Sequence, residues 1–233
     1  DNFASIVNAV EEGRAVFENI RKFLTYILSS NVPELVPYLA FVLFRIPLPL
    51  TVIQILAVDL GTDLLPALAL GAEPPDPALM RQPPRPRGER LLHWPLLVRA
   101  YLWLGALEAV LAMSVFFYLL HGAGWHYGET YSKTDPVYLQ ATTACLAAIV
   151  VAQVFNLFLC RHPRRSFLRT GALGNPLLLL GVAAELGIIA LIVYTPLGNS
   201  LFGTAALGGE IWLFALVLAA AMGVLEEARK LLV

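Results

Sequence analysis

The sequence predicts an all-α polytopic membrane protein with six transmembrane helices, both termini in the cytoplasm and an N-terminal helical stalk. Of 233 residues, 58% are hydrophobic and only 14% are charged, which is typical of membrane proteins rather than soluble domains. Six apolar stretches approach or exceed the ~20 residues that cross ~30 Å of hydrocarbon. All but Arg45 and Lys133 of the 16 lysines and arginines fall on one side of these stretches, and the positive-inside rule assigns that side to the cytoplasm.

Each element follows from the local pattern. Residues 1–22 have the periodicity of an amphipathic helix, which we expect to continue into the first span as a stalk. Residues 23–233 are expected to form the six-helix membrane domain. The Pro/Arg-rich segment 71–93 and the basic segment 161–175 are expected to be cytoplasmic loops. The chain begins inside a helix, so we expect it to be part of a longer polypeptide. The six predicted spans are 23–44, 48–70, 94–120, 137–160, 176–197 and 210–226.

The first two spans carry polar groups at membrane depth. Asn31 and Glu34 are spaced i,i+3, and Asp59, Thr62 and Asp63 are spaced i, i+3 and i+4, so each set is expected on one helical face. A carboxylate costs at least a few kcal/mol in hydrocarbon, which makes it a candidate functional group. The short Pro-rich corner between the spans makes the two helices antiparallel and brings the two faces together. A bound cation is the simplest explanation for three such acids.

The donor atoms indicate which cation. The set contains carboxylate, amide and hydroxyl oxygens without His or Cys, which suits Na⁺, K⁺ or Ca²⁺ and not zinc or copper. Pro33 and Pro37 lack the backbone N–H and so free carbonyl oxygens near Glu34. The alternative is a pair of buried polar clusters that only hold helices together.

Further polar residues lie inside the later spans. Gln153 and Asn156 form an i,i+3 pair in the fourth span, and cation ligation or interhelical hydrogen bonding explains them equally well. Glu185 stands alone in the fifth span and is interpreted as functional. Glu108 in the third span is either a buried protonated acid or a group facing lipid headgroups.

No motif for soluble chemistry is present. The sequence lacks a GxxxxGK[ST] loop and a GxGxxG loop, so any nucleotide that drives the protein is expected to bind elsewhere. Nothing in the sequence indicates a nucleic-acid partner.

Several segments are familiar: DNFASIV, VEEGR, SSNVPELVPYLAFVLFRIPLPL and QILAVDLGTDLLPALALGAEPPDP. They resemble the C-terminal part of class II P-type cation pumps, the family of the sodium/potassium, gastric proton/potassium and sarcoplasmic calcium pumps. The resemblance is densest through residue 83 and returns at VVAQVFNLFLCR, at Glu185 before YTPLG, and at EEARKLL. It implies the end of a phosphorylation domain in residues 1–22, followed by transmembrane helices five to ten.

The resemblance also implies roles for residues. Asp59 is similar to the sodium/potassium branch, whereas Asn156 is similar to calcium pumps. The phosphorylation, nucleotide-binding and actuator domains and helices one to four are missing, so ATP and Mg²⁺ would act only through absent parts. The positions that match the family's cation ligands are Asn31, Glu34, Asp59, Thr62, Asp63, Gln153, Asn156 and Glu185.

The resulting prediction is the cation-binding membrane domain of an ATP-driven pump of the sodium/potassium type, with Ca²⁺ as the other candidate cation. The lipid bilayer is its expected surrounding, and the plasma membrane its expected location. A secondary cation transporter, a channel and a non-transporting structural piece are the alternatives. Many transporters have inverted repeats, and the two halves of this sequence show none.

Overall fold

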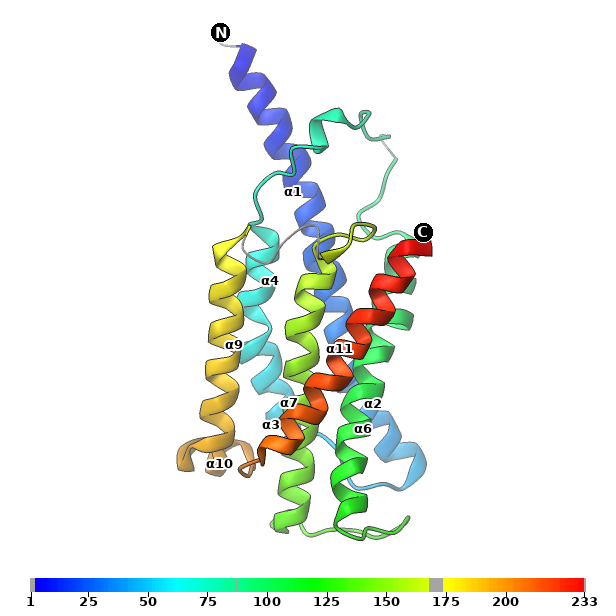
Figure 1. The fold of residues 1–233 in the computed structure, drawn as a ribbon, viewed down its shortest axis with the longest axis vertical. Coiled ribbons are helices and arrows are strands. Elements are labelled where there is room, and N and C mark those ends of the chain that lie inside the picture. Colours follow the sequence, from blue (N-terminus) through cyan, green and yellow to red (C-terminus); the bar gives the residue numbers. More distant parts are fainter. Residues whose placement is uncertain (1–2, 87, 168–173, 233) are drawn as a thin grey trace.

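The computed structural model describes residues 3–86, 88–167 and 174–232, and these residues form helices and loops without a strand. Within these ranges, six helical segments are long and apolar enough to cross a membrane. They run side by side along the long axis of the molecule, and the two chain termini lie at the same end of the bundle (Figure 1). The predicted all-α polytopic class is therefore confirmed. Which side of the membrane holds the termini stays a prediction. Two of the arginines on which that prediction rests, Arg87 and Arg169, lie outside the described residues.

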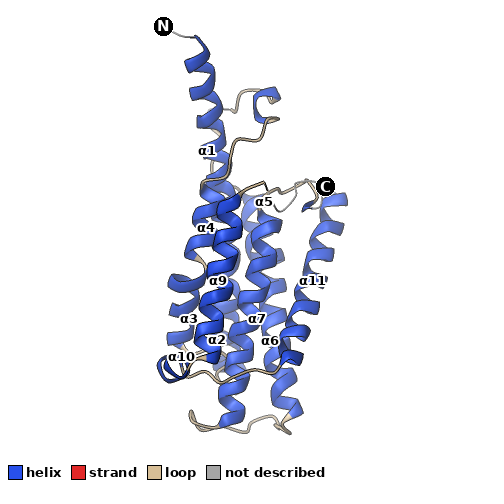
Figure 2. Cartoon of the chain, turned by 60° about the vertical axis from the view of Figure 1, so that its left-hand side comes forward, coloured by secondary structure: helices blue, strands red, loops and turns tan. Residues whose placement is uncertain are grey.

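The first span consists of α1 (Phe3–Ser30) and α2 (Val32–Phe44). The break lies at Asn31, and Pro33 follows in the first turn of α2. Because proline has no backbone N–H, the carbonyl oxygen of Ser29 loses its helical partner at this point. The outer part of α1 projects well beyond the other helices (Figure 2). That shape fits a stalk.

The second span is not the continuous helix predicted over 48–70. It consists of α3 (Val52–Ala57), the π-helix η1 (Val58–Thr62) and α4 (Leu64–Gly71). A π-turn widens the backbone by one residue and often marks a functional site. The i, i+3, i+4 face expected for Asp59, Thr62 and Asp63 is interrupted as a result: Asp59 is exposed, while the other two are buried.

The third span also contains a π-helix. It consists of α5 (Trp94–Leu97), η3 (Val98–Gly105) and α6 (Ala106–Gly122). The 3₁₀ turn η2 (Leu79–Arg81) lies in the long loop before it.

The last three spans are α7 (Pro136–Cys160), α9 (Pro176–Tyr194) and α11 (Gly209–Leu232). The fifth span ends three residues earlier than predicted, because the Thr195 hydroxyl accepts from the Gly198 amide and begins a new helix. That helix, α10 (Pro196–Phe202), occupies part of the loop expected at 198–209. α11 continues past the predicted boundary at 226 to Leu232.

α7 forms the core of the bundle. In its most apolar window 83% of the residues are buried, against 28–44% in the other spans. Small residues such as Ala144, Ala148 and Ala152 are fully buried on it, and small side chains let neighbouring helices approach closely. The outer helices instead expose large apolar side chains such as Leu102 and Leu180. This distribution suits a bundle whose outer surface faces lipid.

Candidate functional site

Some of the predicted polar residues, Asp63, Gln153 and Asn156, form contacts where the end of α1 faces the second span and α7. Asp63 is at the centre, and its side chain is almost completely buried. The Tyr26 hydroxyl donates to Asp63 Oδ1 at 3.4 Å, and the Gln153 side-chain amide donates to Asp63 Oδ2 at 3.2 Å. One carboxylate therefore connects the first, second and fourth spans. Tyr26 is not among the ligands that the sequence predicts, and its contact with Asp63 adds it to the site.

Asn156 forms a second connection between α7 and α1. Its side-chain nitrogen donates to the Ser29 hydroxyl at 2.6 Å, and its oxygen accepts from the Cys160 thiol at 3.3 Å. The Ser29 hydroxyl in turn donates to the backbone carbonyls of Thr25 and Tyr26. Both polar ends of Asn156 are thus engaged, the nitrogen with α1 and the oxygen with Cys160 in its own helix.

Gln153 differs from Asn156 in one respect. Its nitrogen is bonded to Asp63, but its side-chain oxygen is buried without a partner among the described residues. The two amides looked equivalent in the sequence. In the structure, Gln153 has a free acceptor directed into the interior and Asn156 has none.

Several carboxyl oxygens share this state. One oxygen of Glu34, both of Glu108 and both of Glu185 are buried without a hydrogen-bond partner among the described residues. An unpaired polar atom in an apolar interior costs several kcal/mol, ~2–7 depending on the reference, and an unpaired charge costs more. Protons or cations must therefore neutralise these groups.

The remaining predicted ligands are Thr62, which is buried, and Asn31 and Asp59, which are exposed. The Thr62 hydroxyl is buried and donates to the Val58 carbonyl within η1 at 3.1 Å. Asn31 and Asp59 are exposed, so they do not share a buried face with Glu34 and Asp63 as the spacing predicted. Asp59 still lies close enough to interact electrostatically with both buried acids.

The acids do not converge on one point. Among the described residues, no group of three or more His, Cys, Asp or Glu side chains stands close enough to hold a metal ion. A cation bound here would therefore need hydroxyl, amide and backbone carbonyl oxygens beside the carboxylates. Such mixed oxygen sets suit hard cations.

Glu108 is the group that the sequence left open, and the structure places it in the interior with no exposed surface. It lies one turn beyond Gly105, where a Cβ atom would come within 2.9 Å of the Ser29 carbonyl oxygen. The end of η3 therefore packs directly against the break between α1 and α2. The alternative in which Glu108 faces lipid headgroups was wrong, because the close helix approach at Gly105 turns this face inward.

Comparison with known proteins gives one family. The family described as "Cation transporting ATPase, C-terminus" matches residues 47–232. The chain is 33% identical over 258 residues to the sodium/potassium-transporting ATPase subunit alpha-4 of Rattus norvegicus, with 100% of this chain and 25% of the relative covered. It is 34% identical over 257 residues to subunit alpha-3 of Gallus gallus and of Homo sapiens, with the same coverage. The chain thus spans about a quarter of the length of these relatives.

Proposed function

Because the chain belongs to the cation-transporting ATPase family and matches its C-terminal membrane part, we propose that it is the cation-binding transport domain of an ATP-driven Na⁺/K⁺ pump. The observation that carries the proposal is the set of buried carboxyl groups around Asp63 that lack partners. The named relatives transport sodium and potassium, which favours these cations over Ca²⁺. The pump would act in the plasma membrane.

The cation would bind around Asp63. The free oxygens of Glu34 and Gln153 and the hydroxyl of Thr62 would supply ligands in the buried part of the site. Glu185, on α9, would serve a neighbouring position. Asn31 and Asp59 would complete the shell on its open side, and Asn156 would position Ser29 and α1. The residues proposed to bind the cation or to position its ligands are Asn31, Glu34, Asp59, Thr62, Asp63, Gln153, Asn156 and Glu185.

α1 would connect the cation site to the ATP-driven step. It is one continuous helix from Phe3 to Ser30, and its inner end carries Tyr26 and Ser29 at the site. A displacement of the projecting end would therefore move groups that contact Asp63 and Asn156. ATP and Mg²⁺ would act through parts of the pump beyond these residues.

The experiment that tests this proposal measures equilibrium binding of radiolabelled sodium, rubidium and calcium to the purified chain in lipid nanodiscs. We expect Asp63→Asn and Glu34→Gln each to weaken sodium or rubidium binding by at least about tenfold, ~1.4 kcal/mol. Glu210→Gln is the matched control, because Glu210 is exposed at the start of α11.

Two results would contradict the proposal. Unchanged cation binding by Asp63→Asn would show that the ligand assignment is wrong. Steady cation flux through liposomes that contain only this chain, without ATP, would instead indicate a passive transporter or channel.

A further inference from the structure

Glu108 is a buried acid of the third span that the proposed cation site does not include. Its side chain has no exposed surface, and neither of its carboxyl oxygens has a hydrogen-bond partner among the described residues. A buried carboxylate is strongly unfavourable unless a positive charge or a proton neutralises it. Glu108 therefore needs a neutralising partner that the described part of the chain does not supply.

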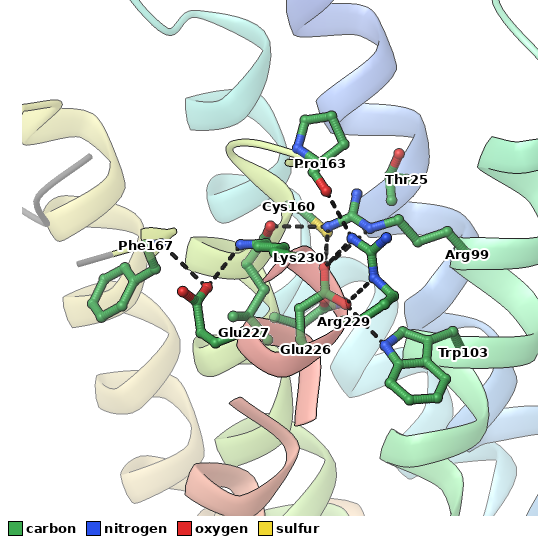
Figure 3. Close-up of polar contacts among 12 residues, drawn as sticks. Thr25, Arg99, Trp103, Cys160, Pro163, Phe167, Glu226, Glu227, Arg229 and Lys230 are labelled. Atoms are coloured by element: carbon green, nitrogen blue, oxygen red, sulfur yellow. Dashed lines mark hydrogen bonds and ion pairs between the residues drawn. The ribbon is translucent and has the colours of Figure 1, made fainter. Parts of the chain in front are cut away.

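Two buried acids outside the cation site are neutralised by cations of the chain itself. Glu226 has no exposed surface, but Arg99 Nη2 lies 2.8 Å from its Oε1, and Arg229 Nε lies 2.7 Å from its Oε2. The Trp103 ring N–H also donates to Oε2 at 2.8 Å, and Figure 3 shows these groups gathered around the carboxylate. Glu73 is likewise shared by one lysine and one arginine. A carboxylate that serves packing is thus paired in this fold.

The position of Glu108 directs it towards the break between α1 and α2. A Cβ atom at Gly105 would lie 2.9 Å from the Ser29 carbonyl oxygen, which has no helical partner because Pro33 lacks an N–H. Glu108 follows Gly105 by three residues, in the first turn of α6, and residues at this spacing share a helical face. Helical side chains lean towards the N-terminal end of their helix. The Glu108 side chain therefore leans towards the turn that contains Gly105 and towards the freed carbonyl.

Glu108 also lies within electrostatic range of the acids of the cation site. Asp63 and Glu34 are the charged groups that act on it most strongly, and Glu185 on α9 is affected by its charge. α6 packs against α2, which carries Glu34, and against α7. Within the described residues, these four acids come from four different spans and share one electrostatic environment.

We propose that Glu108 is a further cation-binding residue of the transport site, and that it is the ligand supplied by the third span. This inference rests on the proposed function. The Glu108 carboxylate and the freed Ser29 carbonyl provide oxygen ligands on the side of the site that faces α6, and hard cations bind such mixed oxygen sets. One added carboxylate balances one elementary charge, so the added ligand suits a monovalent cation such as sodium or potassium.

Equilibrium binding of radiolabelled sodium and rubidium to the purified chain in lipid nanodiscs tests this role with two variants. Glu108→Gln keeps the size of the side chain but removes its charge, so we expect the affinity for the responding cation to fall at least about tenfold. Glu108→Asp keeps the charge on a shorter side chain, and we expect its affinity to stay within about threefold of the unaltered chain. A residue that serves packing alone gives the opposite order, because glutamine fills the same space and aspartate leaves a gap.

Glu210→Gln makes the same chemical change at an exposed acid and should leave binding unchanged. Asp63→Asn separates this inference from the proposed function. If Asp63→Asn weakens binding while Glu108→Gln binds as the unaltered chain does, the role of Glu108 is overturned and the site around Asp63 stands. Weaker binding by Glu108→Asp than by Glu108→Gln would also overturn it. A lack of cation binding by the unaltered chain would overturn both proposals.

Discussion

The side-chain amide of Gln153 donates to Asp63 across 3.2 Å, while the side-chain oxygen of the same glutamine stays buried without a partner. One residue of the central helix thus holds the carboxylate in place and also offers a free acceptor to the interior. This relationship gives Gln153 a different role from Asn156, one turn away, whose polar atoms are both engaged.

We expect Gln153→Leu to weaken cation binding about tenfold, because it removes one oxygen and the hydrogen bond that orients Asp63, which is worth ~1.5–3 kcal/mol to a charged group. Equilibrium binding of radiolabelled sodium or rubidium measures the effect. Gln140→Leu is the matched control on the same helix, since Gln140 is exposed. Equal affinities for the two variants would show that Gln153 serves only helix packing.

We expect Glu108→Gln to reduce the number of protons released when a cation binds. The wild-type carboxyl has two buried oxygens without partners, so it must hold a proton whenever no cation neutralises it. Glutamine keeps the size of the side chain and has no proton to release. A pH-indicator dye in weak buffer records the release, and an unchanged stoichiometry would exclude Glu108 from the exchange.

Gly105→Ala should destabilise the bundle by about 1–3 kcal/mol, the usual cost of forcing extra volume into a packed interior. Its Cβ atom would lie 2.5 Å from Val32 Cγ2, and the backbone carbonyl of Ser29 blocks a simple retreat. Thermal unfolding in detergent measures the loss. Gly187→Ala in α9 meets no atom within 4 Å and should keep or raise the melting temperature. Equal behaviour of the two variants would contradict the close approach at Gly105.

Glu226→Gln should cost about 3–5 kcal/mol, because it leaves buried cationic partners without their shared carboxylate. Arg99 and Arg229 would then repel each other at the end of α11. Hydrogen exchange of the last turns of α11 should rise. Glu227→Gln, one residue further, should have a smaller effect, since Glu227 is more exposed and pairs with Lys230. The reverse order of the two variants would contradict this assignment.

Burial and the nearby positive charges of Lys22 and Arg165 lower the pKa of the His162 imidazole, which predicts a loss of stability in acid. The unfolded chain takes up a proton near the ordinary histidine pKa of ~6.5, whereas the folded chain resists it down to a lower pH. Stability from this group is therefore complete above that ordinary value and declines as the pH falls towards the folded pKa. His162→Gln should flatten this part of the pH profile of unfolding. An unaltered profile would show that His162 does not contribute.

The sequence by itself determined the membrane class, the six spans and the presence of acids inside them. Hydropathy over ~20 residues is a property of the local sequence. An acidic residue inside an apolar stretch can therefore be recognised without knowing which helices pack around it. For the same reason Glu34, Asp63 and Glu185 were identified as interior groups before their surroundings were known. The resemblance to cation pumps was likewise carried by contiguous residues around the first two spans.

Only the tertiary structure decided which of these groups face each other. The π-turn at Val58–Thr62 shifts the helical face by one residue, so Asp59 is exposed although its spacing to Asp63 is helical. The difference between Gln153 and Asn156 depends on partners in α1 and at the junction of η1 and α4. The interior position of Glu108 depends on how closely Gly105 meets Ser29. The shared carboxylates of Glu73 and Glu226 join segments that are far apart in the chain. The burial and pairing of a side chain depend on how the neighbouring helices are rotated and where they touch. The periodicity of one segment specifies neither that rotation nor those contacts.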